Sequence, residues 1–353
     1  MHEDVNEERL MALAGKVMSD VAGAMGVLLA YIGDQTGVYR ALSEMGPSSA
    51  DAIAEKLGTD HRYVHEFLAS NAANGYVDYD PATKRFSMTP EQAIVFSAEG
   101  HPACMQGFFQ SVMSQMEAHE DAVETFRTGN GRAWSEQTPC CFCGTDRFFR
   151  PGYNTHLLDD WLPALDGVKD KLEAGAKVAD IGCGHGSSTI IMARAFPNST
   201  FYGFDFHEPS VEAARSHAKD AGVTNVEFHV TAAKDINGAD FDFVCIFDAL
   251  HDMGDPVGCA KHIRKIMKPD GTFMLVEPLA GDNTEDNFHP LGSIFYAYST
   301  TVCTPASLAQ EVGLGLGTQA GQKRLTDVLN QAGFGRVRRA HETMANMVLE
   351  VRN

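Results

Sequence analysis

The chain has 353 residues, with 44% hydrophobic and 21% charged residues, as in globular proteins, and its length favours two domains over one core. The formal net charge of -19 argues against nucleic acid and anionic membranes as main partners. The eight cysteines lack a disulfide-like spacing, the N-terminus is polar, and no apolar run suggests a membrane span, so we expect a cytoplasmic protein.

Residues 1 to about 45 are predicted to be helical, because apolar side chains recur at steps of three and four residues. Gly23 and Gly26 weaken the case for one unbroken helix. Such an amphipathic helix is either a dimerisation element or a core helix. The repeat consists of Leu10, Leu13, Val17, Val21, Ala24 and Leu28.

Residues 47–95 are predicted to form a winged helix. Ser48–Asp51 caps one helix, which Gly58 ends, and Thr59–Asp60 caps a second helix. Tyr76–Tyr79 and Arg85–Met88 then alternate as the two strands of a hairpin. Acidic residues outnumber basic ones here by seven to four, and the presumed recognition helix carries only Arg62. A DNA reader needs a basic stripe, so we expect a structural or dimerising role and keep DNA binding as the alternative.

Residues 96 to about 156 are predicted to be a helical connector. It carries a stripe of methionine and aromatic side chains, for which core packing is favoured and a wall of a substrate pocket is the alternative. Cys140–Cys143 contains a C-x-x-C spacing, but no second cysteine pair completes a zinc site, so no metal is expected. The stripe consists of Met105, Phe108, Phe109, Val112, Met113 and Met116.

From about residue 157, strand-like and helix-like segments alternate, which predicts an α/β fold with a doubly wound sheet. Ligands of such sheets bind beyond the carboxyl ends of the strands. The predicted strands are 177–181, 200–205, 226–230, 241–247, 272–277 and 347–351. The predicted helices lie near 188–196, 209–221, 256–267 and 321–332.

The stretch Val178–Gly186 is the most informative in the chain. An apolar run ends at Asp180, and glycines follow at 182, 184 and 186 before a helical segment begins. Glycines are needed where the backbone takes positive φ or touches a ligand, and the first N–H groups of a helix face that ligand. The spacing is G-x-G-x-G, which differs from the G-x-G-x-x-G of dinucleotide-binding turns. The stretch therefore predicts a site for a nucleotide-like ligand.

Asp205 ends the second strand, 23 residues after Gly182, where nucleotide-binding folds place an acid on the ribose hydroxyls. The alternative is that Asp205 caps the helix at Pro209–Ser210. Phe206 would cover one face of the adenine. The third strand ends at Ala232 and Ala233, whose backbone groups are candidate adenine contacts.

The fourth strand ends in Phe247-Asp248-Ala249-Leu250-His251-Asp252. A neutral imidazole at this edge can accept the proton of a hydroxyl at neutral pH, so His251 is the candidate general base and Asp252 a candidate orienting acid. The alternative is a histidine that caps the next helix. His185, His207 and His289 have weaker positional cases as bases.

Together these motifs resemble the class I S-adenosylmethionine (SAM) methyltransferases, in particular small-molecule O-methyltransferases. The resemblance covers most of 177–278 and includes Asp270-Gly271-Thr272 and Val276-Glu277-Pro278; Ala232 departs from it, since many relatives have an adenine-binding Asp there. It implies catalytic residues His251 and Asp252, and SAM as the cofactor. The cofactor-binding positions that it implies are Asp180, Gly182, Cys183, Gly184, Gly186, Asp205, Phe206, Ala232, Ala233 and Asp248.

The winged-helix segment resembles the N-terminal domain of a bacterial subgroup of these enzymes, which are usually dimers. The resemblance implies a homodimer in which 1–95 are a winged-helix domain, 96–156 a connector and 157–353 a methyltransferase domain. Residues 279–318 are interpreted as a substrate lid. Methylation of a small acceptor at sulfur or nitrogen, a SAM-responsive DNA-binding regulator and an NAD-dependent oxidoreductase are the alternatives.

Overall fold

A computed structural model describes residues 5–353, which form two compact units. The first unit holds the residues up to Met116 together with Cys143–Pro151. The second holds Glu117–Phe142 and Gly152–Asn353. The functional domain boundaries near residues 95 and 156 stay predictions, because a compact unit need not coincide with a functional domain.

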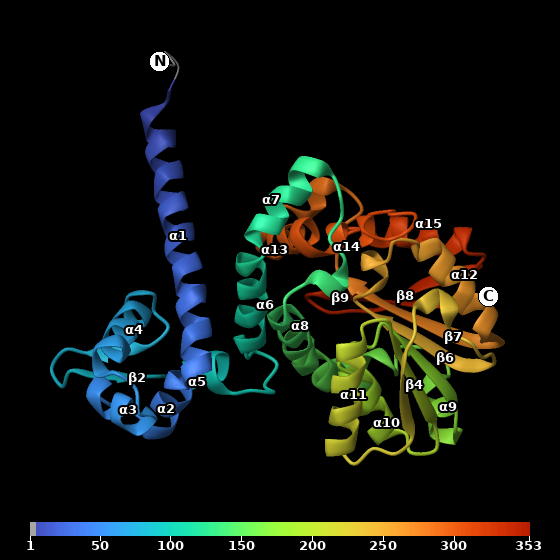
Figure 1. The fold of residues 1–353 in the computed structure, drawn as a ribbon, viewed down its shortest axis with the longest axis horizontal. Helices are drawn as coiled ribbons and strands as arrows, with labels where there is room; N and C mark the ends of the chain where they lie inside the picture. Colours follow the sequence, from blue (N-terminus) through green and yellow to red (C-terminus); the bar gives the residue numbers. More distant parts are fainter. Residues whose placement is uncertain (1–4) are drawn as a thin grey trace. The chain divides into compact units, whose positions relative to one another are not determined.

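The first unit is mainly helical (Figure 1). The helix expected up to residue 45 is two helices, because Gly37 between them has φ of 76°, a left-handed conformation that ends the first. That first helix runs unbroken through Gly23 and Gly26. The elements are α1 (Glu7–Thr36), α2 (Val38–Met45), α3 (Ala50–Leu57), α4 (His61–Ala73), β1 (Asp78–Asp80), β2 (Arg85–Ser87), α5 (Pro90–Ser97) and most of α6 (Gln106–Glu117).

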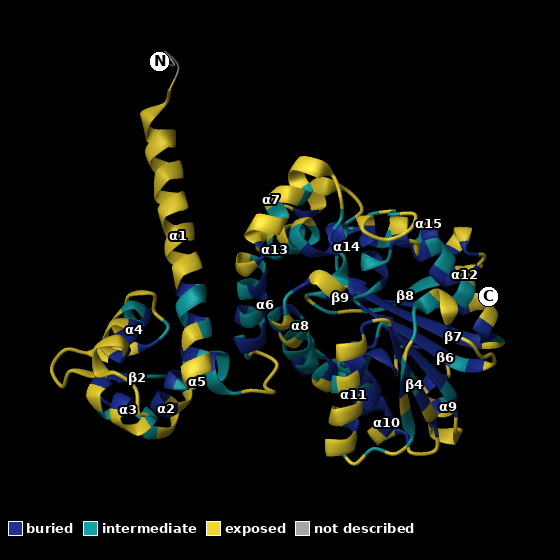
Figure 2. Cartoon of the chain, in the orientation of Figure 1, coloured by how far each residue is buried: buried dark blue, intermediate teal, exposed yellow. Residues whose placement is uncertain are grey.

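The apolar side of α1 is uncovered over its first half (Figure 2). Leu10, Leu13, Val17 and Val21 are each exposed by half or more, so they are not core residues of this chain. The helix has the length and apolar composition of a membrane span, with a mean hydropathy of 1.4 over its best window. The expectation that no apolar run reaches that length was wrong, because a long helix can keep an apolar average while it contains a few charged residues such as Lys16 and Asp20.

The helix, helix and hairpin of the predicted winged helix are confirmed. Ser49 caps α3 by accepting a hydrogen bond from the Ala52 N–H at 3.2 Å, and Gly58 ends it with φ of 65°. Asp60 caps α4 through the Arg62 N–H at 2.8 Å. β1 and β2 pair antiparallel. Their common core includes Leu42, Ile53, Ala54, Val64, Phe67, Leu68, Val77 and Phe86.

The connector is helical, as predicted. Phe109 of its methionine and aromatic stripe belongs to the core of the first unit, and Met105 packs against that core, which favours core packing for these two. None of the eight cysteines, all within the described residues, forms a disulfide. After α6 follow α7 (His119–Thr128), a 3₁₀ turn η1 (Trp134–Glu136), α8 (Pro139–Gly152) and a π-helical segment η2 (Tyr153–Trp161).

The second unit contains a seven-stranded sheet of order β5-β4-β3-β6-β7-β9-β8. β5, β4, β3, β6 and β7 run parallel, β9 is antiparallel to them, and the edge strand β8 is antiparallel to β9 and so runs in the direction of β7. The chain winds outward from β3 in both directions, so the switch point of the sheet lies between β3 and β6. The strands are β3 (Lys177–Ile181), β4 (Thr200–Asp205), β5 (Val226–Val230), β6 (Phe241–Phe247), β7 (Met267–Pro278), β8 (Arg336–Glu342) and β9 (Asn346–Arg352).

All six predicted strands of this sheet are confirmed, and β8 is an additional one. β8 is an edge strand with the sequence Arg-Val-Arg-Arg-Ala-His-Glu, so it lacks the apolar run that reveals buried strands. The four predicted helices are α10 (Ser187–Ala195), α11 (Glu208–Asp220), α12 (Pro256–Ile266) and α15 (Gly321–Gln331), and α9 (Val168–Ala174) was not predicted.

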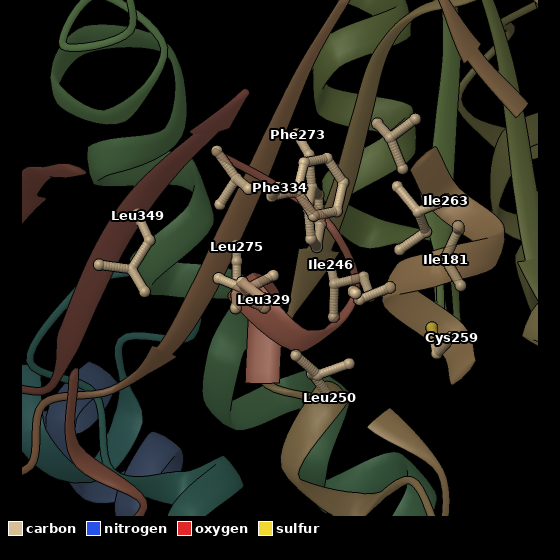
Figure 3. Packing of buried hydrophobic residues seen from close by; sticks show 14 of the residues in the cluster. Ile181, Ile246, Leu250, Cys259, Ile263, Phe273, Leu275, Leu329, Phe334 and Leu349 are labelled. Atoms are coloured by element: carbon tan, nitrogen blue, oxygen red, sulfur yellow. The ribbon is translucent and has the colours of Figure 1, made fainter. Parts of the chain in front are cut away.

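Helices cover both faces of the sheet (Figure 1). The largest core cluster joins β3, β6, β7 and β9 to α12 and α15, and Figure 3 shows Ile246, Phe273 and Leu275 packed among its members. A second cluster joins Cys183 in the glycine turn to α10, α11 and Phe228 of β5. Burial on both sides explains why the central strands are apolar throughout.

The segment expected to be a lid is mostly helical. It contains η5 (Thr284–Asn287), α13 (Pro290–Tyr298), the π-helical η6 (Ser299–Cys303) and α14 (Thr304–Leu308). Ser307 donates a hydrogen bond to the Met253 carbonyl, and Gln310 donates one to the Asp252 carbonyl, each at 2.9 Å. The segment is therefore anchored next to the residues that follow β6.

Candidate active site

The glycine turn after β3 has the backbone conformation that its sequence predicts. Gly182, Gly184 and Gly186 have φ of 74°, 51° and 79°, which side-chain-bearing residues adopt only at a cost. A Cβ on Gly186 would lie 2.7 Å from the Phe228 ring, whereas one on Gly184 would meet no atom within 4 Å. Gly186 is thus required by packing, and Gly184 leaves open space above the turn.

Asp180 lies beneath this turn and is fully buried. Its Oδ2 accepts hydrogen bonds from Ser188 Oγ at 2.8 Å and Thr189 Oγ1 at 2.6 Å, at the start of α10, while its Oδ1 is buried without a hydrogen-bond partner. Burial raises the pKa of Asp180 to about 6, against the lowering effect of the two hydroxyls. The carboxyl group therefore connects the end of β3 to the helix that follows.

Asp205, at the end of β4, links the glycine turn to the next loop. Its Oδ2 accepts the Gly184 N–H at 3.0 Å and its Oδ1 accepts the His207 N–H at 2.9 Å. Burial raises its pKa, and the two backbone hydrogen bonds oppose that shift. The neighbouring Phe206 is 49% exposed, so its ring is accessible to a ligand. Asp205 thus stands beside the turn, and the ribose and adenine contacts of Asp205 and Phe206 stay predictions.

The end of β5 offers backbone and small side chains only. Ala232 precedes a 3₁₀ turn, η3 (Ala233–Asp235), and its carbonyl accepts the Asp235 N–H at 2.9 Å. Both alanines are partly exposed. No side-chain hydrogen bond to an adenine is available from either position.

His251 lies in a 3₁₀ turn, η4 (Leu250–Asp252), directly after β6 and is 3% exposed. Its Nδ1 lies 2.5 Å from Oε2 of Glu277. Glu277 is 1% exposed, and its Oε1 accepts a hydrogen bond from the Leu250 N–H at 3.1 Å. Burial lowers the pKa of His251, but Glu277 and then Asp252 outweigh burial and raise it well above its ordinary value. The pair holds the imidazole in one orientation.

Asp252 and Cys303 lie on the other side of the imidazole. Asp252 Oδ1 is 3.3 Å from His251 Nε2. Potential metal-ligand atoms of His251, Asp252 and Cys303 lie within 4.8 Å of one another. Burial raises the pKa of Cys303 to about 12, so its thiol is protonated at neutral pH.

Asp248, the first residue after β6, is half-buried and has φ of 48°, a strained conformation for a residue with a side chain. Its Oδ1 accepts a hydrogen bond from the Asn346 amide at 2.8 Å, and its Oδ2 has no partner. Burial, and then Glu277, raise its pKa well above the ordinary range. The predicted cofactor position thus holds an acid of raised pKa near the His251–Glu277 pair.

The three alternative histidines have other environments. His289 caps α13 by accepting the Gly292 N–H at 3.1 Å, and Nδ1 of His207 bonds Ser210 Oγ at 2.7 Å. Burial lowers the pKa of His207. The carbonyl of His185 faces Nδ1 of His217 at 3.1 Å. His251 has a carboxylate on its Nδ1 and faces the end of the central strands.

Sequence reasoning missed three residues of this cluster as site residues. The sequence pattern marks Glu277 only as the end of a strand. In the structure, the parallel pairing of β6 and β7 brings it opposite His251. Cys303 belonged to the insertion, and Asn346 lies almost a hundred residues after Asp248. A signal existed for Glu277 alone, because an acid in an otherwise apolar central strand is unusual.

Comparison with protein families gives two matches. Residues 172–333 match a methyltransferase domain model, and residues 23–98 match an Rv2258c-like winged helix-turn-helix domain model. The chain is 30% identical over 127 residues to the ubiquinone biosynthesis O-methyltransferase of Actinobacillus pleuropneumoniae serotype 7, covering 33% of this chain and 52% of that protein. It is 33% identical over 114 residues to that of Neisseria meningitidis serogroup A, covering 31% and 46%. The chain thus spans about half the length of these relatives.

Solved structures match nearly the whole chain. Mitomycin 7-O-methyltransferase has a TM-score of 0.71 at 19% identity, over 99% of this chain and 100% of that one. Human N-acetylserotonin methyltransferase in complex with SAM has a TM-score of 0.68 at 17% identity, over 100% and 99%. These likenesses establish the fold. Residues 23–98 therefore form a winged helix-turn-helix domain and residues 172–333 a methyltransferase domain, as the motifs predicted, on a fold shared with these methyltransferase structures.

Proposed function

We propose that this protein transfers a methyl group from SAM to a hydroxyl group of a small molecule, with His251 as the general base. The buried His251–Glu277 pair at the switch point of the sheet carries the proposal. O-methyltransferases among the relatives and structural neighbours support the acceptor class. The protein's own acceptor is a hydroxylated small molecule in this proposal.

The residues around the glycine turn fit SAM. The open space at Gly184 admits a ligand close to the backbone, and Phe206 offers an exposed aromatic face for the adenine. Asp205 keeps unused lone pairs for ribose hydroxyls. When bound, SAM supplies an electrophilic methyl carbon on its sulfonium. Asp180, Gly182, Cys183 and Gly186 shape the turn, the backbone of Ala232 and Ala233 serves the adenine, and Asp248 completes the cofactor side in this proposal.

Deprotonation of the acceptor depends on His251. Glu277 occupies Nδ1, which leaves Nε2 as the atom that takes the hydroxyl proton. The carboxylates of Glu277 and Asp252 stabilise the imidazolium that results. Asp252 thus has an electrostatic role, and the anchored segment 279–318 is proposed to cover the acceptor.

The raised pKa of His251 supports a second candidate, methylation at sulfur or nitrogen of a small acceptor. An imidazolium at neutral pH is a poor base, and a thioether or amine acceptor needs little deprotonation. A DNA-binding regulator is less well supported, since Arg62, the single Lys or Arg on α4, pairs with Glu66 at 2.5 Å. The methyltransferase domain disfavours an NAD-dependent oxidoreductase.

We also propose a cytoplasmic homodimer formed through α1. The exposed apolar side chains of this helix favour a second copy as partner, because each would cover the other. The absence of disulfides among the described cysteines agrees with a reducing compartment. Nucleic acid and membranes are not partners in this proposal, since the net charge is -19.

The test is a turnover screen that measures S-adenosylhomocysteine release with a panel of phenols, thiols, thioethers and amines. Phenolic acceptors should be turned over, and His251→Ala should lower kcat by about 10²- to 10⁴-fold without changing SAM affinity. Full turnover by His251→Ala would sink the general-base role. Turnover of amines or thioethers alone would replace the proposal by the second candidate.

A further inference from the structure

Three side chains of different chemistry meet beside the His251 imidazole. His251 and Asp252 come from η4 after β6, and Cys303 is the last residue of the π-helical η6 in the segment 279–318. One potential ligand atom of each lies within 4.8 Å of the other two. Cys303 has no part in the proposed proton transfer, and π-helical turns are often found at functional sites.

One oxygen of this cluster has an ion-pair neighbour but no direct hydrogen bond. Asp252 Oδ1 is buried and makes no hydrogen bond, although His251 Nε2 lies 3.3 Å away. A buried carboxylate oxygen needs a positive partner, which a protonated imidazole supplies and which a bound cation can replace. The neighbouring acid Glu277 is also buried and lies against the same imidazole.

The imidazole is held as metal-binding histidines are held. Glu277 engages Nδ1 at 2.5 Å, which leaves Nε2 directed toward Asp252. A carboxylate on the far nitrogen of a liganding histidine fixes its orientation and increases its basicity. The donors are then an imidazole nitrogen, a thiolate sulfur and a carboxylate oxygen, the set that zinc accepts.

We propose that His251, Asp252 and Cys303 bind one zinc ion, through Nε2, Oδ1 and Sγ. Tetrahedral zinc with bonds of 2.0–2.3 Å holds its ligand atoms about 3.3–3.7 Å apart. The Nε2–Oδ1 distance of 3.3 Å already meets that requirement, and the thiol must approach by about an ångström at most. Three protein ligands leave the fourth position open.

Zinc and a proton compete for the same lone pair on Nε2. Binding displaces protons from His251 and Cys303, because zinc takes a neutral imidazole and a thiolate as ligands. A zinc-bound His251 cannot act as the general base. Binding of a thiophilic cation such as zinc therefore switches off the proposed general base. The presence of the zinc site does not depend on which acceptor is methylated.

The experiment titrates the full-length protein with Co²⁺, whose bond to a thiolate absorbs in the near ultraviolet, and with Zn²⁺ against a chromophoric chelator. The wild type should bind one equivalent and show the sulfur-to-cobalt band. Cys303→Ser should lose the band and weaken zinc binding by at least about 100-fold, and Glu277→Gln should weaken it by about 10- to 100-fold. Cys143→Ser, on an exposed cysteine of the C-x-x-C segment, is the matched control.

Asp252→Asn provides a second ligand variant and should weaken zinc while keeping the cobalt–sulfur band. Thermal melts of each variant establish that it is folded. Absence of the band in the wild type, its persistence in Cys303→Ser, or its loss in Cys143→Ser would each overturn the proposal.

Discussion

Nδ1 of His251 and Oε2 of Glu277 lie 2.5 Å apart, although 26 residues separate them along the chain. β6 and β7 are parallel neighbours, so their carboxyl ends lie at the same edge of the sheet. Glu277 is held in place by the Leu250 N–H, and it stabilises the positively charged form of the imidazole. The pair therefore controls the pH at which His251 becomes a base.

The first prediction concerns the pH dependence of turnover. The pKa of His251 is raised, so kcat for a hydroxyl acceptor should increase with pH through a midpoint above 6.5, the usual value for histidine. Glu277→Gln removes a negative charge that favours the imidazolium, so its midpoint should move to lower pH. Measurement of kcat from pH 5 to 10 checks this. Glu285→Gln, an exposed acid in η5, should leave the profile unchanged.

A wild-type profile that is flat from pH 5 to 10 would show that no group with a raised pKa limits the reaction. An unchanged midpoint in Glu277→Gln would show that Glu277 does not raise the pKa of His251.

The second prediction contrasts two glycines of one turn. Gly186→Ala should lower the free energy of unfolding by about 2–4 kcal/mol, because left-handed backbone strain adds to overpacking against Phe228. Gly184→Ala should cost about 1–2 kcal/mol, from backbone strain alone, but should weaken SAM binding at least about tenfold. Urea unfolding and calorimetric titration with SAM measure both quantities.

The control for these variants is Gly58→Ala, at a left-handed position with no atom within 4 Å of a Cβ. It should lose as much stability as Gly184→Ala without any change in SAM affinity. Equal SAM affinity for Gly184→Ala and the wild type would contradict the placement of the cofactor against this turn.

The third prediction concerns Asp180 and stability. The pKa of Asp180 is about 6 in the folded protein and 3.8 in the unfolded chain, so the folded protein keeps this proton to higher pH. This contribution to the free energy of unfolding is complete below pH 3.8 and is lost as the pH rises to 6, a fall of about 3 kcal/mol. Asp180→Asn should lack that fall. Urea unfolding at pH 4, 5 and 6 tests it; equal slopes for both proteins would refute it.

The fourth prediction concerns α1. Val17→Glu places a charge in the exposed apolar row, so the proposed dimer should dissociate at least about tenfold more readily. Sedimentation velocity over a range of concentrations measures the effect. Ser19→Glu, on the opposite side of the same helix, is the control. A wild type that is monomeric at all concentrations, or that binds lipid vesicles, would refute α1 as a dimer surface.

The sequence determined most elements of the sheet and the glycine turn beside the proposed site. Apolar runs ending in Asp180, Asp205 and Phe247 located β3, β4 and β6, and parallel strands place such ends at one edge. The spacing of three glycines indicated a ligand at the start of α10. These features are local, so a linear pattern records them. β8 escaped because an edge strand need not be apolar.

Only the tertiary structure decided what surrounds His251. Glu277, Cys303 and Asn346 reach the cluster from β7, η6 and β9. Glu277 contacts His251, 26 residues away along the chain, and Asn346 donates to Asp248, 98 residues away. The burial that shifts the pKa values of His251 and Asp248 also arises from packing of distant segments. A sequence shows which residues can ionise. The spatial neighbours of each residue determine whether it ionises, because charge interactions and desolvation act over ångströms in space and not along the chain.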